Sequence, residues 1–530
     1  MKDHQLSSSS SSCDAVVGRV LFPIYVLVLF LLLYAQAGCS LFLDEAFSVF
    51  VARKPCDQIA KALQEDTWPP LYYGALHLWI ALFGDGERSV RSLSLSLFLL
   101  SLMVTYHLAQ SVFSERTVAL YSAWLMSVMR TSVAHATNTR GYMMLYLISA
   151  IASNLFFLLA YRTERKLTYV LLYMVACYTG LMTHYSFAFV MLMHLFLSSV
   201  RLRQCLLYIL FAQCVSVTLF TLTWGTVFFH QLRHIAPIAV AWIKPTSIMT
   251  VTEGLVAPLG SFTASSRSAA VTLLSWALLL LPLVLSVLRE RRKVDIHTGN
   301  LLIMTAAGFG TLLIVSRFKP SYVPGRQDVI FLPLISLLFA RWLCLLTSTR
   351  VTLWVLVSLS VLRLTVVTYA ATRSDLGTDR WVARSICSLA QRNDVVILTD
   401  LSWCGINYYL ERVCHSKDLE IIAFPADIPS HPGWRDMKLI AEPSRLEQEI
   451  TALIQHLGVA RSKGSKNVII GMNPAPVYQA IPQRLDNHLT FVSRRGVPNH
   501  RKTGTFISEI LYYRLTPTTP TSQPKRESQR

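Results

Sequence analysis

Two acidic pairs that lie close together in the chain are the first candidates for chemistry. Asp44-Glu45 and Glu65-Asp66 belong to a stretch, residues 41–73, that follows the first long apolar run. The second pair is followed by the sequence Trp-Pro-Pro-Leu-Tyr-Tyr. Carboxylates near hydrocarbon are costly to hold, which makes a functional role the first hypothesis for them. A carboxylate in such a place is able to take the proton from an attacking hydroxyl or amine.

Each of these acids also has a purely structural explanation. Asp44 is placed where it would N-cap a helix beside the membrane, and Glu45 would interact favourably with the dipole of that helix. Glu65 and Asp66 are compatible with a solvated loop. We expect Asp44 and Glu45 to be catalytic, and Glu65 and Asp66 to bind the acceptor or to supply a second acid.

The composition indicates an integral membrane protein. Of the 530 residues, 53% are hydrophobic and 15% are charged, whereas soluble globular proteins carry about 25% charged residues. The net charge of +19 would fit nucleic-acid binding, but the basic residues form short runs between apolar stretches, as in polytopic membrane proteins. Because no basic-aromatic groove or known reader motif is present, we expect no nucleic-acid partner. The cysteines show no CxxC pairing, so no metal or redox motif is indicated.

Apolar runs of sufficient length predict about eleven membrane-spanning helices. We expect residues 1–17 to form a disordered cytoplasmic tail and the first span to be retained rather than cleaved as a signal peptide. With this orientation, the short connections on the cytoplasmic side, among them 162–166 and 289–293, are all basic, as the positive-inside rule requires. The predicted spans are 18–38, 91–112, 118–137, 141–161, 167–182, 184–200, 204–229, 269–288, 298–316, 328–347 and 351–370.

The apolar segment 71–84 is too short to be a further span. Its length of about 14 residues is typical of an interfacial or re-entrant helix, and counting it as a span would move the basic connections outside. Both acidic pairs therefore face the exoplasm, in a loop that covers residues 39–90. Cys39 and Cys56 flank the first pair and would be able to form a disulfide on an oxidising side, although isolated thiols are favoured. The loop 230–268 is exoplasmic too, and its prolines suggest interfacial helices that cover a cavity.

The C-terminal region, residues 371–515, predicts a small exoplasmic α/β domain, because apolar strand-like runs alternate with helical stretches. We interpret this domain as accessory. It contains no GxGxxG or P-loop sequence, so a nucleotide-binding role is unsupported. The tail 516–530 is rich in Thr, Pro and Ser and is expected to be disordered. The predicted strands are 395–400, 419–424, 467–472, 489–494 and 505–515, and the predicted helices are 380–392, 403–413, 443–457 and 475–484.

Basic residues at the exoplasmic helix ends predict a binding site for a lipid-linked phosphate. Cationic side chains there would hold the phosphate and stabilise the charge that grows as it leaves. Glycosyl transfer from a polyprenyl-phosphate sugar has these requirements, since nucleotide sugars and ATP are absent from the exoplasm. A divalent metal bound by Glu45 or Asp66 is compatible with the sequence, but no spacing requires one. The phosphate-binding candidates are Arg140, Arg326, His184 and Lys319.

Three of these candidates have a structural alternative, and further polar residues lie at the same helix ends. Arg140 and Arg326 would also serve to anchor helix ends to lipid headgroups, and His184 would also serve to form a hydrogen bond between helices. The other polar residues at this face are Arg88, Arg91, His135, Arg317, Tyr322 and Gln327.

Six motifs follow one another in the order LDEAF (43–47), WPPLYYGALHLWIALFG (68–84), RSLSL (91–95), TRGYMMLYL (139–147), THY (183–185) and VPGRQDVIFLPLISLLFA (323–340). In these motifs the chain, over roughly residues 18–370, resembles the polyprenyl-phosphate-sugar-dependent glycosyltransferases of the GT-C superfamily. The most similar branch is that of protein O-mannosyltransferases and lipid A aminoarabinose transferases.

The resemblance implies an inverting transfer on the exoplasmic face, with Asp44 as the catalytic carboxylate. It also implies that basic residues of later loops hold the lipid phosphate. Arg140 and Arg326 fit this role. The chain departs from the family pattern at two places. Trp68 stands where many relatives have a histidine, and Asn138-Thr139 precedes Arg140 where an acid is often found. A ligand role at the first place is therefore absent, and a second acid from that turn is in doubt.

The sequence thus predicts a GT-C-like polytopic membrane glycosyltransferase, in the inner membrane of a bacterium or the endoplasmic reticulum of a eukaryote. Its donor is a polyprenyl-phosphate-linked sugar, whereas the sugar and the acceptor are not predicted. A transporter or flippase for lipid-linked or anionic solutes is the main alternative, although such proteins place ionisable groups near the membrane midplane and show internal repeats. An inactive relative that serves as an assembly partner is a third interpretation.

Overall fold

The computed structural model describes residues 2–162, 164–261, 266–289, 295–372, 375–434, 442–486, 488–498 and 505–515. The chain divides into two compact units. The helical unit comprises Met1–Cys39 and Val51–Arg373, and the second unit comprises Ser40–Phe50 and Ser374–Arg530. A short part of the first loop is therefore grouped with the C-terminal region. The tail 516–530, which we expected to be disordered, lies outside the described residues.

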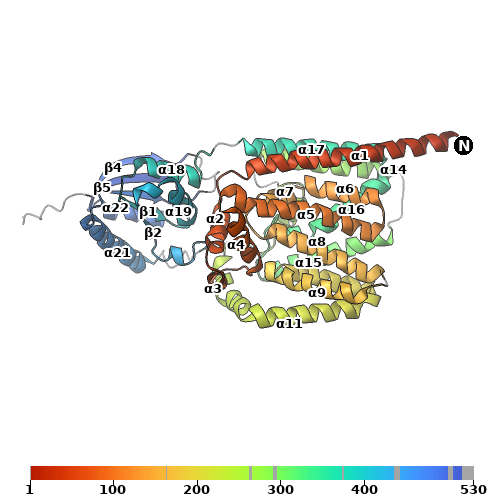
Figure 1. Cartoon of the computed structure of the whole chain (residues 1–530), viewed down its shortest axis with the longest axis horizontal. Helices are drawn as coiled ribbons and strands as arrows, with labels where there is room; N and C mark the ends of the chain where they lie inside the picture. The colour runs from red at the N-terminus through yellow and green to blue at the C-terminus, as the bar shows by residue number, and fades with distance from the viewer. Residues whose placement is uncertain are drawn as a thin grey trace, which may run out of the picture. The chain divides into compact units, whose positions relative to one another are not determined.

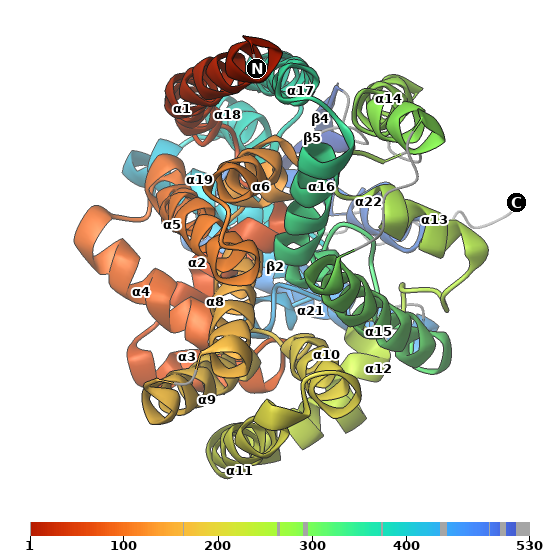
Figure 2. The ribbon, with the colours of Figure 1, turned by 90° about the vertical axis from the view of Figure 1, so that its right-hand side faces the viewer.

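The helical unit is a bundle of long helices, which lie side by side in Figure 1 and are seen nearly end-on in Figure 2. Each predicted span coincides with a helix or a pair of helices. Among the described residues, seven helices are long and apolar enough to cross a membrane. The chain is thus an integral membrane protein, while the count of about eleven spans stays a prediction. The helices are α1 (Lys2–Gln36), α5 (Glu87–Phe113), α6 (Arg116–Val128), α7 (Arg130–Ala136), α8 (Tyr142–Tyr161), α9 (Lys166–Thr183), α10 (Phe187–Val200), α11 (Leu206–His230), α14 (Ser266–Arg289), α15 (Ile296–Phe318), α16 (Leu332–Leu346) and α17 (Thr349–Ala371).

Two helices differ from the prediction. α1 begins at Lys2, so it includes the polar segment for which we expected disorder; that segment contains neither glycine nor proline to end a helix. The third predicted span is broken at Met129, whose backbone is extended (φ −65°, ψ 130°). The break is possible inside the bundle because Arg363 of α17 donates from Nε to the carbonyl oxygen of Val128 at 2.8 Å. This side chain satisfies a backbone acceptor that the interrupted helix leaves open.

The short helix α4 (Leu71–Phe83) lies across the bundle. Its 13 residues give a length of about 20 Å, well below the roughly 30 Å of a bilayer core. Figure 2 shows α4 extended across the view, whereas the long helices are seen nearly end-on. This orientation agrees with an interfacial or re-entrant helix and not with a further span.

Contacts between the connecting segments divide them into two sets. In one set, Arg341 of α16 forms ion pairs with Glu115 before α6 (2.6 Å) and with Asp295 before α15 (3.1 Å). In the other set, His135 Nε2 lies 2.7 Å from the carbonyl oxygen of Gly325. The first set comes from connections predicted to be cytoplasmic and the second from connections predicted to be exoplasmic. The grouping therefore agrees with the predicted alternation of spans, and the compartment that each set faces stays a prediction.

The second unit contains a five-stranded sheet in the order β2-β1-β3-β5-β4. β1 pairs in parallel with β2 and β3, and β5 pairs antiparallel with β3 and β4. The predicted strands are all present, with shifted bounds, and the mixed pairing was not predicted. The strands are β1 (Val395–Thr399), β2 (Glu420–Phe424), β3 (Asn467–Met472), β4 (Leu489–Gly496) and β5 (Glu509–Leu515), and the helices are α18 (Asp379–Leu389), α19 (Ser402–Val413), α21 (Pro443–Ser462) and α22 (Ala480–Leu485).

Alternate residues of the central strands build the core of this domain. Val395 and Ile397 of β1, with Val468 and Ile470 of β3, pack against apolar residues of α21, as the two-residue period of a strand requires. Burial of each such side chain stabilises the fold by roughly 1.5–3 kcal/mol. A disulfide between Cys387 and Cys414, which we did not predict, joins the end of α18 to the residue after α19.

Burial also raises the pKa of a carboxyl group in this domain, that of Asp379, to about 7, against a smaller lowering by the Thr505 hydroxyl. Gly405 leaves room for the carboxyl, since a Cβ atom there would clash with Asp379 Oδ2. Between about pH 4 and pH 7 the folded domain holds a proton that the unfolded chain has lost. Stability from this group is therefore present at low pH and is lost as the pH rises, by about 1.4 kcal/mol per pH unit.

We accordingly expect Asp379→Asn to raise the midpoint of thermal unfolding at pH 7 and to flatten its dependence on pH between 4 and 7. The amide keeps the shape of the carboxylic acid and carries no charge. The measurement is the unfolding of the full-length protein in detergent over this pH range. Asp427→Asn, at an exposed carboxylate of the same domain, is the control. Identical pH profiles for wild type and Asp379→Asn would contradict the prediction.

Candidate functional site

The first acidic pair lies in the first turn of α2 (Leu43–Ala52). The Glu45 carboxylate accepts the backbone N–H of Phe42 at 3.0 Å, and the Ser48 hydroxyl donates to the carbonyl oxygen of Asp44 at 2.9 Å. A carboxylate that reaches back to an N–H at the start of a helix has a capping role. Of the two predicted catalytic residues, Glu45 thus has a structural function in the second unit, and Asp44 is the better candidate for a base.

The second acidic pair is split between two environments of the helical unit. Asp66 is buried and accepts a hydrogen bond from the Tyr73 hydroxyl at 3.4 Å. Glu65 is exposed at the end of α3 (Cys56–Gln64), where its Oε1 lies 3.3 Å from His230 Nε2. Asp66 therefore faces the interior, whereas Glu65 has the solvated position of the alternative interpretation.

Arg140 is the centre of a buried polar cluster that includes Asp66. Its Nη1 donates to the Tyr73 hydroxyl at 3.3 Å, and Tyr73 in turn bonds to Asp66. The guanidinium carbon lies 4.5 Å from the centre of the Trp68 ring, which is a cation–π contact. Arg140 itself is only 7% exposed, so it does not have the headgroup-anchoring position that was the alternative. The Arg140 side chain therefore connects the turn at residues 139–142 to the part of the first loop that carries Asp66 and Trp68.

His184 lies against the same tryptophan. The rings of His184 and Trp68 meet edge to face with centroids 4.5 Å apart. The backbone N–H of Ser186 donates to Nδ1 of His184 at 3.0 Å, so Nδ1 carries no proton and the neutral ring must hold its proton on Nε2. His184 therefore offers one N–H donor close to the Arg140 cation.

Arg326 lies on a loop whose shape is held by its neighbours. Gly325 has φ +80°, a conformation that glycine adopts without strain. The Asp328 carboxylate accepts hydrogen bonds from the Gly325 N–H and the Tyr322 hydroxyl. The same loop reaches the cluster through Gly325, whose carbonyl contacts His135, and the His135 ring lies 4.6 Å from that of Tyr142. The Tyr142 ring also contacts the Trp68 ring, with the two ring centroids 5.1 Å apart.

The structure thus brings three predicted residues together, Asp66, Arg140 and His184, and leaves others apart. Lys319 is exposed at the end of α15. Arg326 lies with its guanidinium 5.6 Å from the Trp242 ring, and the neighbouring Gly325 contacts His135. Asp44 and Glu45 belong to the other compact unit.

Sequence reasoning missed the aromatic residues that build the cluster. Trp68 was noted only as a departure from a family histidine, yet it lies against both Arg140 and His184. Tyr73 and Tyr142 were unassigned. The three aromatic residues of the Trp-Pro-Pro-Leu-Tyr-Tyr sequence were a signal that could have indicated the cluster. Such residues provide apolar packing, and a tyrosine also provides a hydroxyl group that is able to bond a buried polar side chain.

Arg91 has a structural function. Its Nη1 donates to the carbonyl oxygens of Ala37, at 3.0 Å, and Cys39. These groups lie just beyond the C-terminal end of α1, where helix carbonyls need external donors. Arg91 therefore holds the point at which the first loop begins. Cys39 and Cys56 are free thiols, as favoured from the sequence.

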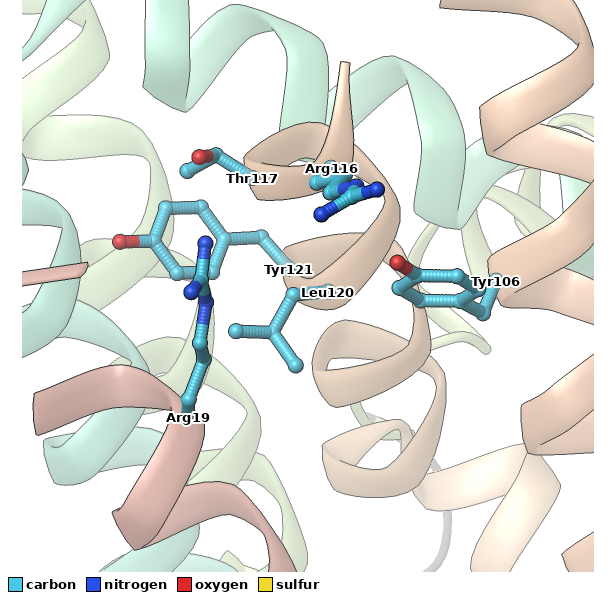
Figure 3. Close-up of a pocket in the computed structure, with 6 residues that line it drawn as sticks. All are labelled: Arg19, Tyr106, Arg116, Thr117, Leu120 and Tyr121. Carbon is cyan, nitrogen blue, oxygen red and sulfur yellow. The ribbon is translucent and has the colours of Figure 1, made fainter. Parts of the chain in front are cut away.

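No group of three or more His, Cys, Asp or Glu side chains suited to a metal ion occurs within the described ranges. A pocket of about 300 Å³ lies elsewhere, among α1, α5 and α6. Figure 3 shows Arg19, Tyr106 and Arg116 around it. Arg116 begins α6, in a connection predicted to be cytoplasmic, and none of the predicted site residues lines the pocket. It is therefore not the predicted donor site.

Close packing at Gly141 predicts a large effect of a side chain there. A Cβ atom at this position would lie 3.0 Å from Trp68 Cζ3 and 3.2 Å from Tyr72 Cβ. Gly141→Val is expected to displace Trp68 from Arg140 and to destabilise the protein by about 1–3 kcal/mol. Gly74→Ala in α4, where nothing lies within 4 Å, is the matched control and should be neutral or slightly stabilising. Equal thermal unfolding midpoints for the two variants would contradict this packing.

Comparison with solved structures establishes the class of fold. The chain is similar to ArnT from Cupriavidus metallidurans in the apo state, with a TM-score of 0.59 and 13% identity over 94% of this chain and 98% of that one. The structure of the same protein bound to undecaprenyl phosphate gives a TM-score of 0.58 and 13% identity over 93% and 97%. The chain therefore has the same fold as ArnT.

A more distant similarity is to the Archaeoglobus fulgidus oligosaccharyltransferase, with a TM-score of 0.46 and 9% identity over 85% of this chain and 69% of that one. No protein-family model and no curated protein matches the chain.

Proposed function

We propose that the protein is a glycosyltransferase that moves a sugar from a polyprenyl-phosphate carrier to an acceptor on the exoplasmic face of the membrane. The observation that carries this proposal is the cluster of Arg140, Trp68 and His184 at one end of the helical bundle. It combines one cation and one neutral N–H donor, which suits the phosphate group of a lipid whose tail remains in the bilayer.

The proposed reaction inverts the configuration of the sugar. Asp44 accepts the proton of the acceptor hydroxyl or amine as that group attacks the anomeric carbon. The bond between this carbon and the phosphate oxygen breaks, and its electron pair leaves with the polyprenyl phosphate. Arg140 and His184 stabilise the phosphate charge that develops, and Arg326 and Lys319 remain candidates for further contacts with it. Asp66 and Glu65 are proposed to contact the acceptor, or to supply a second acid.

The fold supports a lipid phosphate as the leaving group, because the similar ArnT structure holds undecaprenyl phosphate. The disulfide between Cys387 and Cys414 supports placement of the C-terminal domain in the exoplasm, since disulfides persist in oxidising compartments. The short basic connections on the opposite face support the same orientation. A reporter fused after residue 371 tests it, and a cytosolic signal would contradict the proposal.

The direct test uses purified full-length protein in lipid nanodiscs with a panel of hexosyl and pentosyl polyprenyl phosphates. We expect release of free polyprenyl phosphate from at least one donor, measured by mass spectrometry, and faster release with acceptor present. A transporter or flippase would instead move the intact lipid-linked solute between leaflets of a liposome without cleaving it. Movement without cleavage of any donor would contradict the glycosyltransferase assignment.

A further inference from the structure

The part of the first loop that carries Asp44 packs with the C-terminal domain. Residues 40–50 belong to the same compact unit as the residues after 374, although more than 300 residues separate them in the chain. The backbone N–H of Leu41 donates to the hydroxyl of Tyr409 at 2.7 Å, and the backbone N–H of Arg380 lies 3.4 Å from the Ser40 hydroxyl. These contacts hold the chain three and four residues before Asp44.

Aromatic contacts hold α2 beyond Asp44. The ring of Phe47 lies 5.1 Å from that of His431, and a Cβ atom on Gly433 would be 3.0 Å from the Phe47 ring. The Phe50 ring meets that of Trp403 edge to face at 5.9 Å. Because Phe47 and Phe50 are three residues apart, they lie on the same side of the helix. Asp44 is thus bracketed by contacts from one domain on both sides of its turn.

Tyr409 is itself firmly held. It is buried in α19, with its ring edge to face on Tyr408 at 4.8 Å and the Arg380 guanidinium 5.5 Å from its centre. The residue after α19, Cys414, is in the disulfide with Cys387. The acceptor for the Leu41 N–H therefore has little freedom to move. Because both groups are buried, this N–H has no ready access to water as a replacement partner.

We propose that the C-terminal domain is a positioning element of the active site, and that Tyr409 is a positioning residue for Asp44. This inference rests on the proposed function, in which Asp44 is the general base. A base must lie within hydrogen-bond reach of the proton that it removes, and a displacement of about 1 Å lowers the rate by as much as a hundredfold. The domain that the sequence suggested to be accessory would then be required for the chemical step.

The test replaces Tyr409 by phenylalanine in the full-length protein, which removes the hydroxyl and keeps the ring. We expect turnover to fall about tenfold or more, with the KM for the lipid-linked sugar changed by less than about twofold, because only the transition state is affected. Hydrogen exchange followed by mass spectrometry should become faster in residues 40–47 and stay unchanged in the sheet. Tyr512→Phe on β5 is the matched control and should leave both measurements at wild-type values.

A second variant approaches the same helix from the other side. Gly433→Val places a side chain against the Phe47 ring and should also lower turnover and loosen residues 40–50 without changing the KM for the donor. Wild-type turnover in both variants, with Asp44→Asn inactive, would overturn the positioning role and leave the proposed function intact. A wild-type protein that transfers no sugar would instead overturn the proposed function itself. In that case, faster hydrogen exchange in residues 40–47 of Tyr409→Phe would still support the contact between Tyr409 and the first loop.

Discussion

Replacement of Asp44 by asparagine is expected to lower turnover by about a thousandfold. General-base catalysis contributes about 10²–10⁴ to a rate, and asparagine is unable to accept the proton of the acceptor. The fold should be retained, because Asp44 lies in the first turn of α2 and asparagine keeps the size and shape of its side chain. The measurement is single-turnover release of polyprenyl phosphate from the donor by wild type and variant at saturating acceptor.

Two neighbouring substitutions make this result specific. Asp57→Asn, in the first turn of α3 on the same loop, changes the charge by the same amount and should leave turnover unchanged. Glu45→Gln keeps an oxygen that is able to accept the N–H of Phe42 and should retain most of the activity, since its role is in capping. Equal turnover in wild type and Asp44→Asn would remove Asp44 from the mechanism. Loss in Glu45→Gln alone would move the base to that residue.

Replacement of Arg140 by glutamine is expected to lower kcat/KM by about 10²–10³, the loss that follows removal of one group that stabilises developing charge. The buried guanidinium is stacked on Trp68 and bonded to Tyr73, so it is held in place before the donor binds. Lysine should not restore activity, because its ammonium group lacks the planar shape that stacks and bonds at the same time. Steady-state kinetics and retention of polyprenyl phosphate in native mass spectra measure the effect.

The control for Arg140 is a cation removed from the opposite face of the bundle. Arg201 lies at the end of α10, in a connection predicted to be cytoplasmic. Arg201→Gln should leave kcat/KM within about twofold of wild type. If Arg140→Gln and Arg201→Gln behaved alike, the phosphate would bind elsewhere. Arg326 and Lys319 would then become the leading candidates, because both lie on the connection between α15 and α16.

Much of the fold followed from local patterns. The long apolar runs predicted the helices of the bundle, because a span must be apolar over its whole length and this requirement is written in consecutive residues. The apolar runs at 395–400 and 467–472 predicted buried strands for the same reason. The break of the third span at Met129 was not predictable, since it depends on Arg363, more than 200 residues later, which donates to the carbonyl of Val128.

For the site, the sequence by itself determined which residues are chemically able to act: the acids near the first span and the basic residues near later helix ends. Only the tertiary structure decided which of them lie together and what they contact. It showed that Trp68 contacts both Arg140 and His184, that Glu45 caps α2, and that the segment just before α2 is hydrogen-bonded to Tyr409 of the C-terminal domain. These contacts join residues that are distant in the sequence. Which residues meet in this way is decided by the packing of whole elements, and such packing leaves no periodic or local pattern in the sequence.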